Sequence, residues 1–432
     1  MTDLRDLSFE ELRAALGALD VPAYRARQIF AWLYQKKASS FEAMTDLPRD
    51  LREKLGACFS FQPLEVAGLT RSRDGTSKTL FRLADGLSIE TVLIPAGTRR
   101  TVCLSTQAGC KFACVFCASG LLGFRRDLTT AEILGQVLYF RDVLDVGLTN
   151  IVFMGMGEPL DNFDNVEKAI RILNDPRGFG FAARRMTVST SGFVPGIARF
   201  KKLDLQVNLS VSLHAADDET RSRLMPINRR FPLADVMAAC EDYLGSSGRK
   251  LTFEYVLIKG VNDRPEDAER LARIARDLRA KVNLIPYSPV PGLPFERPGN
   301  EDLSAFVRRL EVRGQEATLR DSKGSDIQAA CGQLALRTET PSVPAENEKP
   351  EEAFPKKKVE SPSLGTDGKF PRPHGRSQNP ERSPSGPKSE TGRPRLKGEG
   401  SAPVKDARGI GYDRSRGRKS PELPKKNRRS RG

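Results

Sequence analysis

The feature that most constrains the fold is a repeated alternation of two kinds of segment, which begins at about Thr101. Short apolar runs rich in β-branched residues alternate with longer segments whose apolar residues recur at helical spacing. The predicted strands are TVCLST, NIVFMGMG, RMTVSTSG, QVNLSVSLH, LTFEYVLI and KVNLIPYS, and the predicted helices between them are TTAEILGQVLYFRDVL, NVEKAIRILND, VPGIARFKKL, LADVMAACEDYL and PEDAERLARIARDLRA. Strands that alternate with helices in this way predict a parallel α/β sheet.

The number of these units leaves the architecture open between two forms. Six units are too few for the usual closed eight-stranded barrel, and a doubly wound sheet is the competing arrangement. Polar residues cluster at the ends of the predicted strands. Because α/β folds place their ligands at the carboxyl ends of strands, we expect the functional site there.

Three flanking segments differ from this central region, which we expect to occupy residues 99–337. Residues 1–62 predict a small helical domain that opens with the capping-box pattern SFEE, and its interleaved basic residues suit either RNA contact or an ordinary charged outer face. Residues 63–98 contain short alternating runs and turn signals, which predict a small β-element. Residues 338–432 are rich in Pro, Ser, Gly, Lys and Arg, so we predict a disordered basic tail. It would serve either solubility or RNA tethering.

Charge and hydropathy narrow the function classes. The 432-residue chain has a formal net charge of +15, which is compatible with a polyanionic partner such as RNA. No apolar run reaches the roughly 18 residues that a transmembrane helix needs, and the N-terminus lacks the pattern of a secretory signal. We therefore expect a cytoplasmic protein with no membrane partner. In that compartment clustered cysteines indicate metal ligation or catalysis rather than disulfides.

The strongest chemical signal is the segment GCKFACVFC, which spaces Cys110, Cys114 and Cys117 as C-x-x-x-C-x-x-C. Three thiolates on one short loop can ligate three irons of a [4Fe–4S] cluster and leave the fourth iron open. A zinc site would want four ligands, but the chain has only two histidines and no second C-x-x-C pair. The spacing therefore favours a cluster over zinc.

This three-cysteine spacing is the hallmark of radical S-adenosylmethionine enzymes, and the surrounding sequence resembles the RlmN family. The likeness covers almost all of residues 1–337 and is carried by TVCLSTQAGCKFACVFCASGLLGFRRDLT, YRARQIFAWLYQK, FEAMTDLPRDLREKL, GMGEPLDN, STSGFVP, SLHA, MPINRRFPL and DIQAACGQLA. The resemblance implies an α/β fold, a partial (β/α)6 barrel. It also implies methylation of C2 of an adenosine in 23S rRNA and of an adenosine next to the anticodon in tRNA.

The resemblance also assigns residues to the cofactor S-adenosylmethionine, of which two molecules would be used per turnover. In GMGEP, Gly157 and Glu158 would contact its amino group. Ser189 in STSG and the three residues of SLHA would line the same cofactor, namely Ser212, Leu213 and His214. The family usually has Asn where this chain has Ser288, although a serine can still form a hydrogen bond. On sequence alone, His214 is equally well explained as a buried core histidine.

Three further residues acquire catalytic roles only through the resemblance. Cys331 would carry a methyl group on its sulfur. Cys103 would resolve the protein–RNA adduct by forming a transient disulfide with Cys331. Glu90 would accept the C2 proton. Without the resemblance, both cysteines would be assigned as buried thiols and Glu90 as a charge at a strand edge. Cys58 and Cys240 match no motif, and Cys240 is predicted to lie in the core.

The partners follow from the same resemblance. We expect a monomer that takes electrons from flavodoxin or ferredoxin and acts on 23S rRNA and tRNA. Two alternatives stay open from the sequence. One is a related enzyme that methylates C8 of the same base, and the other is a non-catalytic RNA-binding protein with a structural metal.

Overall fold

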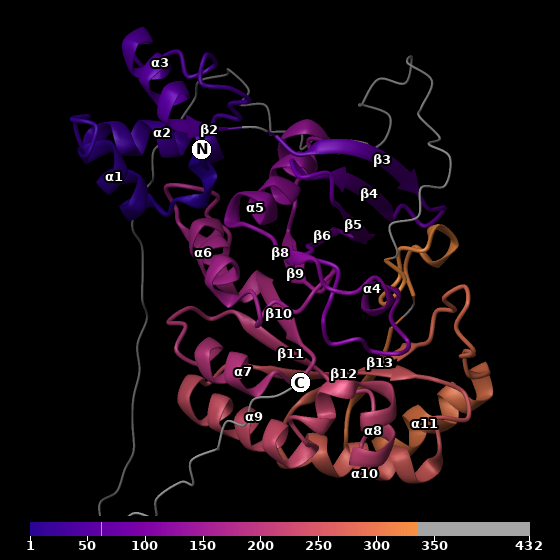
Figure 1. The fold of residues 1–432 in the computed structure, drawn as a ribbon. Helices are drawn as coiled ribbons and strands as arrows, with labels where there is room; N and C mark the ends of the chain where they lie inside the picture. Colours follow the sequence, from indigo (N-terminus) through magenta and orange to yellow (C-terminus); the bar gives the residue numbers. More distant parts are fainter. Residues whose placement is uncertain (62, 321, 335–432) are drawn as a thin grey trace, which may run out of the picture. The chain divides into compact units, whose positions relative to one another are not determined.

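The computed structural model of the protein describes residues 1–61, 63–320 and 322–334 (Figure 1). The predicted C-terminal tail, 338–432, lies outside the described residues. The elements below all belong to the compact unit that contains the N-terminal and central regions.

A ten-stranded sheet organises the central region, with strand order β14-β13-β12-β11-β10-β9-β6-β5-β4-β3. Seven neighbouring strands are parallel and follow one another in chain order, namely β6 (Arg99–Cys103), β9 (Asn150–Phe153), β10 (Met186–Thr190), β11 (Asn208–Ser212), β12 (Leu251–Leu257), β13 (Lys281–Pro286) and β14 (Ala317–Leu319). A doubly wound sheet would reverse this order at a switch point. The unreversed order confirms the predicted partial barrel, and β14 is a parallel strand that the sequence did not predict.

Helices follow these strands and pack beside one another along the sheet (Figure 1). They are α5 (Thr130–Leu138), α6 (Phe163–Asn174), α7 (Val194–Phe200), α8 (Asp218–Leu224), α9 (Leu233–Ser247), α10 (Pro265–Asp277) and α11 (Asn300–Val312). On β11 the fully buried Leu209 and Val211 belong to the apolar core, whereas Ser210 and Ser212 alternate onto the opposite face. The core therefore lies between sheet and helices, and the other face of the sheet carries polar groups.

The predicted β-element is an antiparallel extension of the same sheet. It consists of β3 (Glu65–Arg71), β4 (Ser77–Arg82) and β5 (Ser88–Ala96), and β5 pairs with β6. The connection from β6 to α5 holds three short elements, which are β7 (Gln107–Ala108), α4 (Ala118–Leu121) and β8 (Arg126–Asp127). This connection carries the three-cysteine motif.

The N-terminal region is helical, as predicted, with α1 (Phe9–Gly17), α2 (Tyr24–Tyr34), α3 (Arg49–Cys58) and the short paired strands β1 (Thr2–Asp3) and β2 (Phe59–Ser60). The capping box at the start of α1 is confirmed, because Ser8 and Glu11 bond reciprocally to each other's backbone. Asp6 accepts a 2.7 Å hydrogen bond from the backbone N–H of Ala131 at the start of α5. That bond joins the N-terminal region to the barrel.

The described residues also form short helical turns, at Leu4–Asp6, Tyr139–Val143, Ala183–Arg185, Pro226–Arg229 and Ser325–Ile327. Within the described part of the chain, every helix is too short or too polar to cross a membrane.

Candidate active site

A buried glutamate joins the carboxyl ends of β9 and β10. One carboxylate oxygen of Glu158 accepts hydrogen bonds from the backbone N–H and the hydroxyl of Ser191, at 2.7 and 2.8 Å, and the other accepts from the backbone of Leu160. Burial raises the pKa of Glu158, and these hydrogen bonds oppose the shift. The preceding Gly157 has φ +97°, and a Cβ there would lie 2.5 Å from the Cβ of Gln107. Glycine at this position is therefore required by close packing of the turn.

A fully buried arginine fastens the next two strand ends together. The guanidinium of Arg221 donates to the carbonyl oxygens of Ser191, Leu213 and Ser212, at 2.7, 3.1 and 3.4 Å, and to the side chain of Asn228 at 2.7 Å. Burial lowers the pKa of Arg221 to about 10. The sequence offered no signal for this residue, because three other arginines follow within nine positions, namely Arg223, Arg229 and Arg230.

His214 is a hydrogen-bonded core histidine in this structure. Its Nδ1 accepts a 3.0 Å bond from the backbone N–H of Val256, and burial followed by the charge of Arg221 lowers its pKa to about 3. The imidazole is therefore neutral at ordinary pH, and its ring packs edge-on against Phe116 in the cysteine loop.

The remaining predicted cofactor residues occupy the carboxyl ends of β10, β11 and β13. Ser189 lies on β10, Ser212 is the last residue of β11, and Leu213 is buried directly after it. Ser288 follows β13 and is also buried. The fold thus brings these residues to one edge of the sheet, as predicted, although no contact here tests their roles.

Backbone bonds fix the three-cysteine loop to two distant segments. The N–H of Val115 donates to the carbonyl of Leu224, and the N–H of Ala118 donates to the carbonyl of Gly332. Cys117 stands at the start of α4, and the three cysteines are partly exposed. Burial and the charges of the other two thiols raise the pKa of Cys114, so the three sulfurs lie close together.

These sulfurs suit a cluster better than a single metal ion. Among the described residues, no three Cys, His, Asp or Glu side chains converge as one metal ion would require. A cubane places a different requirement on its ligands, because each thiolate binds a different iron. Burial raises the pKa of Cys110 to about 12, and iron supplies the positive charge that stabilises such a thiolate.

Cys331 lies beside the cysteine loop and close to Cys103. The adjacent Gly332 accepts the hydrogen bond from Ala118, next to Cys117. Cys103, at the end of β6, is buried, and its pKa is raised first by burial and next by the charge of Cys331. Cys331 is solvent-exposed as a residue, yet its thiol is surrounded closely enough that desolvation raises its pKa. The two thiols, 228 positions apart in the chain, are therefore close enough for the charge of Cys331 to raise the pKa of Cys103.

Charged groups that the sequence did not single out surround these two thiols. The buried Glu254 on β12 accepts hydrogen bonds from Ser210 and Asn283, and its other oxygen lies 3.8 Å from Arg320. The charge of Glu254 raises the pKa of Cys331, and Arg320 lowers it. On β5, the buried Glu90 forms an ion pair with Lys78. The sequence indicated this pair only weakly, because it showed no more than a lysine and a glutamate on the two strands of one hairpin.

Comparison with known proteins first defines the class. Residues 104–273 match the model of the radical SAM superfamily, and residues 2–60 match the N-terminal domain of a ribosomal RNA large subunit methyltransferase. A radical SAM methyltransferase from Sphaerobacter thermophilus superposes with a TM-score of 0.74 at 49% identity, covering 77% of this chain and 99% of that chain. The protein is therefore a radical S-adenosylmethionine protein with a [4Fe–4S] cluster, as predicted.

The relatives then define the family. The probable dual-specificity RNA methyltransferase RlmN of Heliobacterium modesticaldum is 50% identical over 77% of this chain and 89% of its own length. The dual-specificity RNA methyltransferase RlmN of Geobacter sulfurreducens is 48% identical over 77% of this chain and 92% of its own length. This chain belongs to the RlmN family of RNA methyltransferases, which confirms the predicted family.

Proposed function

We propose that this RNA methyltransferase acts on C2 of an adenosine in 23S rRNA and of an adenosine next to the anticodon in tRNA. The observation that carries the proposal is the position of Cys331, whose neighbour Gly332 accepts a 2.7 Å hydrogen bond from Ala118 in the cysteine loop and whose charge reaches Cys103. An enzyme that transfers a methyl group directly to a nucleophilic atom has no need of two neighbouring thiols beside a cluster.

The cofactors would be held by the residues at the strand ends. Cys110, Cys114 and Cys117 would ligate the cluster. S-adenosylmethionine would be bound by the other residues predicted at this edge of the sheet, namely Gly157, Glu158, Ser189, Ser212, Leu213, His214 and Ser288. Arg221 would keep these strand ends in register, because it binds three of their carbonyl oxygens. When bound, the cluster and S-adenosylmethionine supply the electron and the carbon radical that the chain itself cannot provide.

The chain's own residues would complete the reaction. The Cys331 thiolate would accept a methyl group on sulfur, and the methyl carbon would later be joined to adenine C2. Glu90 would take the C2 proton, and the odd electron left after the carbon adds to C2 would be returned to the cluster. The Cys103 thiolate would then attack the Cys331 sulfur, so that an S–S bond forms, the C–S bond breaks and the released carbon takes up a proton to become the methyl group of the base. Excluding water from this buried site would protect the reactive carbon.

The tests are the two single-alanine variants of the thiol pair. Cys331→Ala should give neither methylated RNA nor a covalent adduct, because it has no sulfur to carry the methyl group. Cys103→Ala should form a protein–RNA adduct that survives denaturation, because no second thiol releases the base. Cys240→Ala is the matched control, because Cys240 is a buried thiol in the core. Normal methylation by Cys331→Ala, or normal turnover without an adduct by Cys103→Ala, would refute the proposal.

The position of the methyl group is decided separately. Nuclease digestion of the product RNA and mass spectrometry distinguish 2-methyladenosine from 8-methyladenosine. A methyl group on C8 would assign the chain to the alternative reaction. Use of flavodoxin or ferredoxin, a monomeric state and a cytoplasmic location stay predictions.

A further inference from the structure

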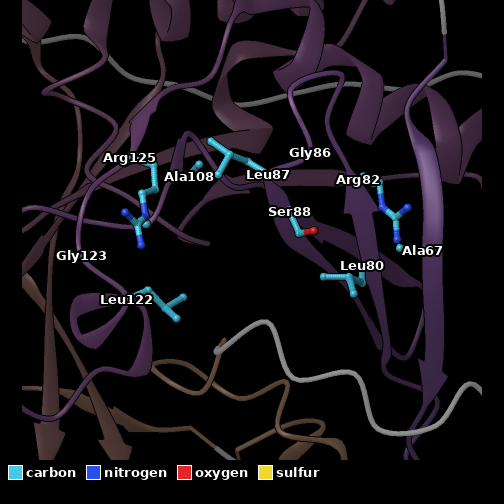
Figure 2. Close-up of a pocket in the computed structure, with 11 residues that line it drawn as sticks. Ala67, Leu80, Arg82, Gly86, Leu87, Ser88, Ala108, Leu122, Gly123 and Arg125 are labelled. Atoms are coloured by element: carbon cyan, nitrogen blue, oxygen red, sulfur yellow. The ribbon is translucent and has the colours of Figure 1, made fainter.

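A cavity of about 360 Å³ lies between the β4–β5 hairpin and the segment that follows α4 (Figure 2). Its lining includes two arginines, one serine and three leucines, namely Arg82, Arg125, Ser88, Leu80, Leu87 and Leu122. In Figure 2, Arg82 and Arg125 stand on opposite sides of this space. The cavity is separate from the buried strand ends that would bind S-adenosylmethionine.

The register of the hairpin places this cavity next to the predicted proton acceptor. In the β4–β5 pair, Leu80 lies opposite Glu90, and Arg82 lies opposite Ser88. Residues two apart in a strand share a face at a spacing of about 6.6 Å. Glu90 and the cavity residue Ser88 therefore lie on the same face, one step apart. Gly109 also lines the cavity and directly precedes Cys110.

The electrostatics of the cavity favour an anion. Within the described part of the chain, the side chain of Arg125 has no ion pair or hydrogen bond, and that of Arg82 has only an exposed ion pair with Glu65 at 3.7 Å. The adjacent Arg126 differs, because the hydrogen bonds that it donates to Glu132 and Asp85 raise its pKa and fix it in place. Of two neighbouring arginines, one is structural and the other faces an open cavity without a partner.

The backbone holds Arg125 in position. Its N–H donates to the carbonyl of Ala108 at 2.9 Å. A Cβ on Gly109, where φ is +78°, would lie 1.7 Å from the carbonyl oxygen of Gly123. This close packing locks the two segments that carry the cavity wall. The neighbouring Phe124 is 39% exposed, and an exposed aromatic ring is a surface on which a base can stack.

We propose that this cavity holds a nucleotide adjacent to the target adenosine, with its phosphate between Arg82 and Arg125 and its base against the leucines. The proposal rests on the proposed function, in which the target base lies beside Glu90. S-adenosylmethionine has no phosphate, so a phosphate held between the two arginines would belong to the RNA. Arginine binds phosphate through paired N–H groups, and proteins read single-stranded RNA by enclosing splayed bases. The volume is in the range of small-ligand pockets.

The first experiment measures RNA affinity. A synthetic anticodon stem-loop RNA is titrated against the full chain at several salt concentrations, with fluorescence anisotropy as the readout. Arg125→Ala and Arg82→Ala should each bind about tenfold more weakly, and the slope of log affinity against log salt should fall by about 0.7 for each lost phosphate contact. Arg308→Ala is the charge-matched control, because Arg308 is exposed on α11. Unchanged iron content and thermal unfolding check that each variant is folded.

The second experiment identifies the phosphate. Single methylphosphonate linkages, which lack the charge, replace the phosphates on either side of the target adenosine one at a time. The wild-type protein should lose affinity at one linkage, and Arg125→Ala should lose nothing further at that linkage. Equal binding by the Arg125 and Arg308 variants, or additive losses at every linkage, would overturn the proposal.

Other outcomes separate this proposal from its alternatives. If the wild-type protein bound no stem-loop RNA, the proposed function would fail with the pocket. If Arg125→Ala bound RNA normally but was reduced more slowly by flavodoxin, the arginines would serve an acidic protein partner, and the nucleotide proposal would be wrong.

Discussion

The Nζ atom of Lys78 lies 2.9 Å from a carboxylate oxygen of Glu90, and both side chains are almost completely buried. The same ammonium group donates to the carbonyl of Gln328 at 3.3 Å. Gln328 lies three residues before Cys331 in the chain. Lys78 therefore connects the predicted proton acceptor to the segment that carries the predicted methyl carrier.

Replacing Lys78 should destabilise the protein, because it separates the buried ion pair with Glu90. Lys78→Met leaves the Glu90 carboxylate without its buried counter-ion, so we expect a loss of about 3 kcal/mol in the free energy of unfolding. The double variant Lys78→Met/Glu90→Gln removes both charges and should be more stable than Lys78→Met alone. Urea denaturation measures both values. If the double variant were as unstable as Lys78→Met, the ion pair would not be the cause.

Arg221 should be required for binding S-adenosylmethionine, because it holds together the strand ends that would bind this cofactor. Lys lacks the planar fork of donors that binds several carbonyl oxygens at once, so Arg221→Lys should lose about 2 kcal/mol of stability and bind S-adenosylmethionine at least tenfold more weakly. Arg223→Lys is the matched control, because Arg223 is exposed on the same helix. Equilibrium binding of S-adenosylmethionine and thermal unfolding distinguish the two variants. Equal behaviour would contradict a positioning role for Arg221.

The cluster assignment has its own test. Cys114→Ala removes one of three thiolates, so anaerobically reconstituted protein should lose most of its iron and sulfide while its far-ultraviolet circular dichroism stays unchanged. Cys58→Ala is the control, because Cys58 is exposed on α3, away from the loop. A Cys114→Ala protein with full iron content would show that this thiol is not a ligand.

Local sequence patterns predicted the parallel α/β sheet and the cysteine loop because their signals are local, whereas the partial barrel was implied only by the family resemblance. Strand and helix periods differ within a few residues, and the three thiols that the fold brings together lie within eight positions. Arg221 was missed because burial is a tertiary property. Nothing in RSRLMPINRR distinguishes the fully buried Arg221 from the exposed Arg223. The short strand β14 and the helix α8 were missed because three and seven residues carry too little periodicity. The thirteen-residue helix α11 was also missed, although its buried Leu303, Phe306 and Leu310 recur at helical spacing.

Local residue patterns could not predict that Cys103 and Cys331 lie close together, because their proximity is a tertiary property. Their proximity depends on the return of residues 324–334 to the cysteine loop after the last strand of the barrel. Only the family resemblance linked the two thiols in advance. Gly157 shows the converse, since a residue singled out for ligand contact is explained by the packing of its turn on Gln107.

Asp74 fastens the segment that leads to Cys331. Its carboxylate accepts hydrogen bonds from the backbone N–H groups of Thr76 and Gly324, at 2.9 and 3.0 Å, and Ser72 of the same turn donates to Asp326 at 2.6 Å. Burial opposes ionisation, but hydrogen bonds from Thr76, Gly324 and Ser72 prevail and lower the pKa of Asp74 to about 2 from its ordinary 3.8. The β3–β4 turn thus holds residues 324–326 in place.

This pKa sets the pH at which the attachment should fail. The folded protein binds the Asp74 proton less readily than the unfolded chain, so the stabilisation is complete above about pH 4 and is lost as the pH falls toward 2. Because Asp74 is exposed, solvent screening limits the effect to about 1 kcal/mol. Asp74→Asn should raise amide hydrogen exchange of residues 324–334 at pH 7 several-fold. After correction for intrinsic exchange rates, amide exchange of residues 324–334 in the wild type should rise below pH 4. Asp74→Asn should remove that rise. Asp85→Asn is the control. Asp85 lies in the β4–β5 turn and accepts a hydrogen bond from Arg126 instead, so this variant should leave the exchange of residues 324–334 unchanged. Equal exchange in the Asp74 and Asp85 variants would mean that other contacts hold the Cys331 segment, since of these two aspartates Asp74 is the one that accepts a hydrogen bond from Gly324.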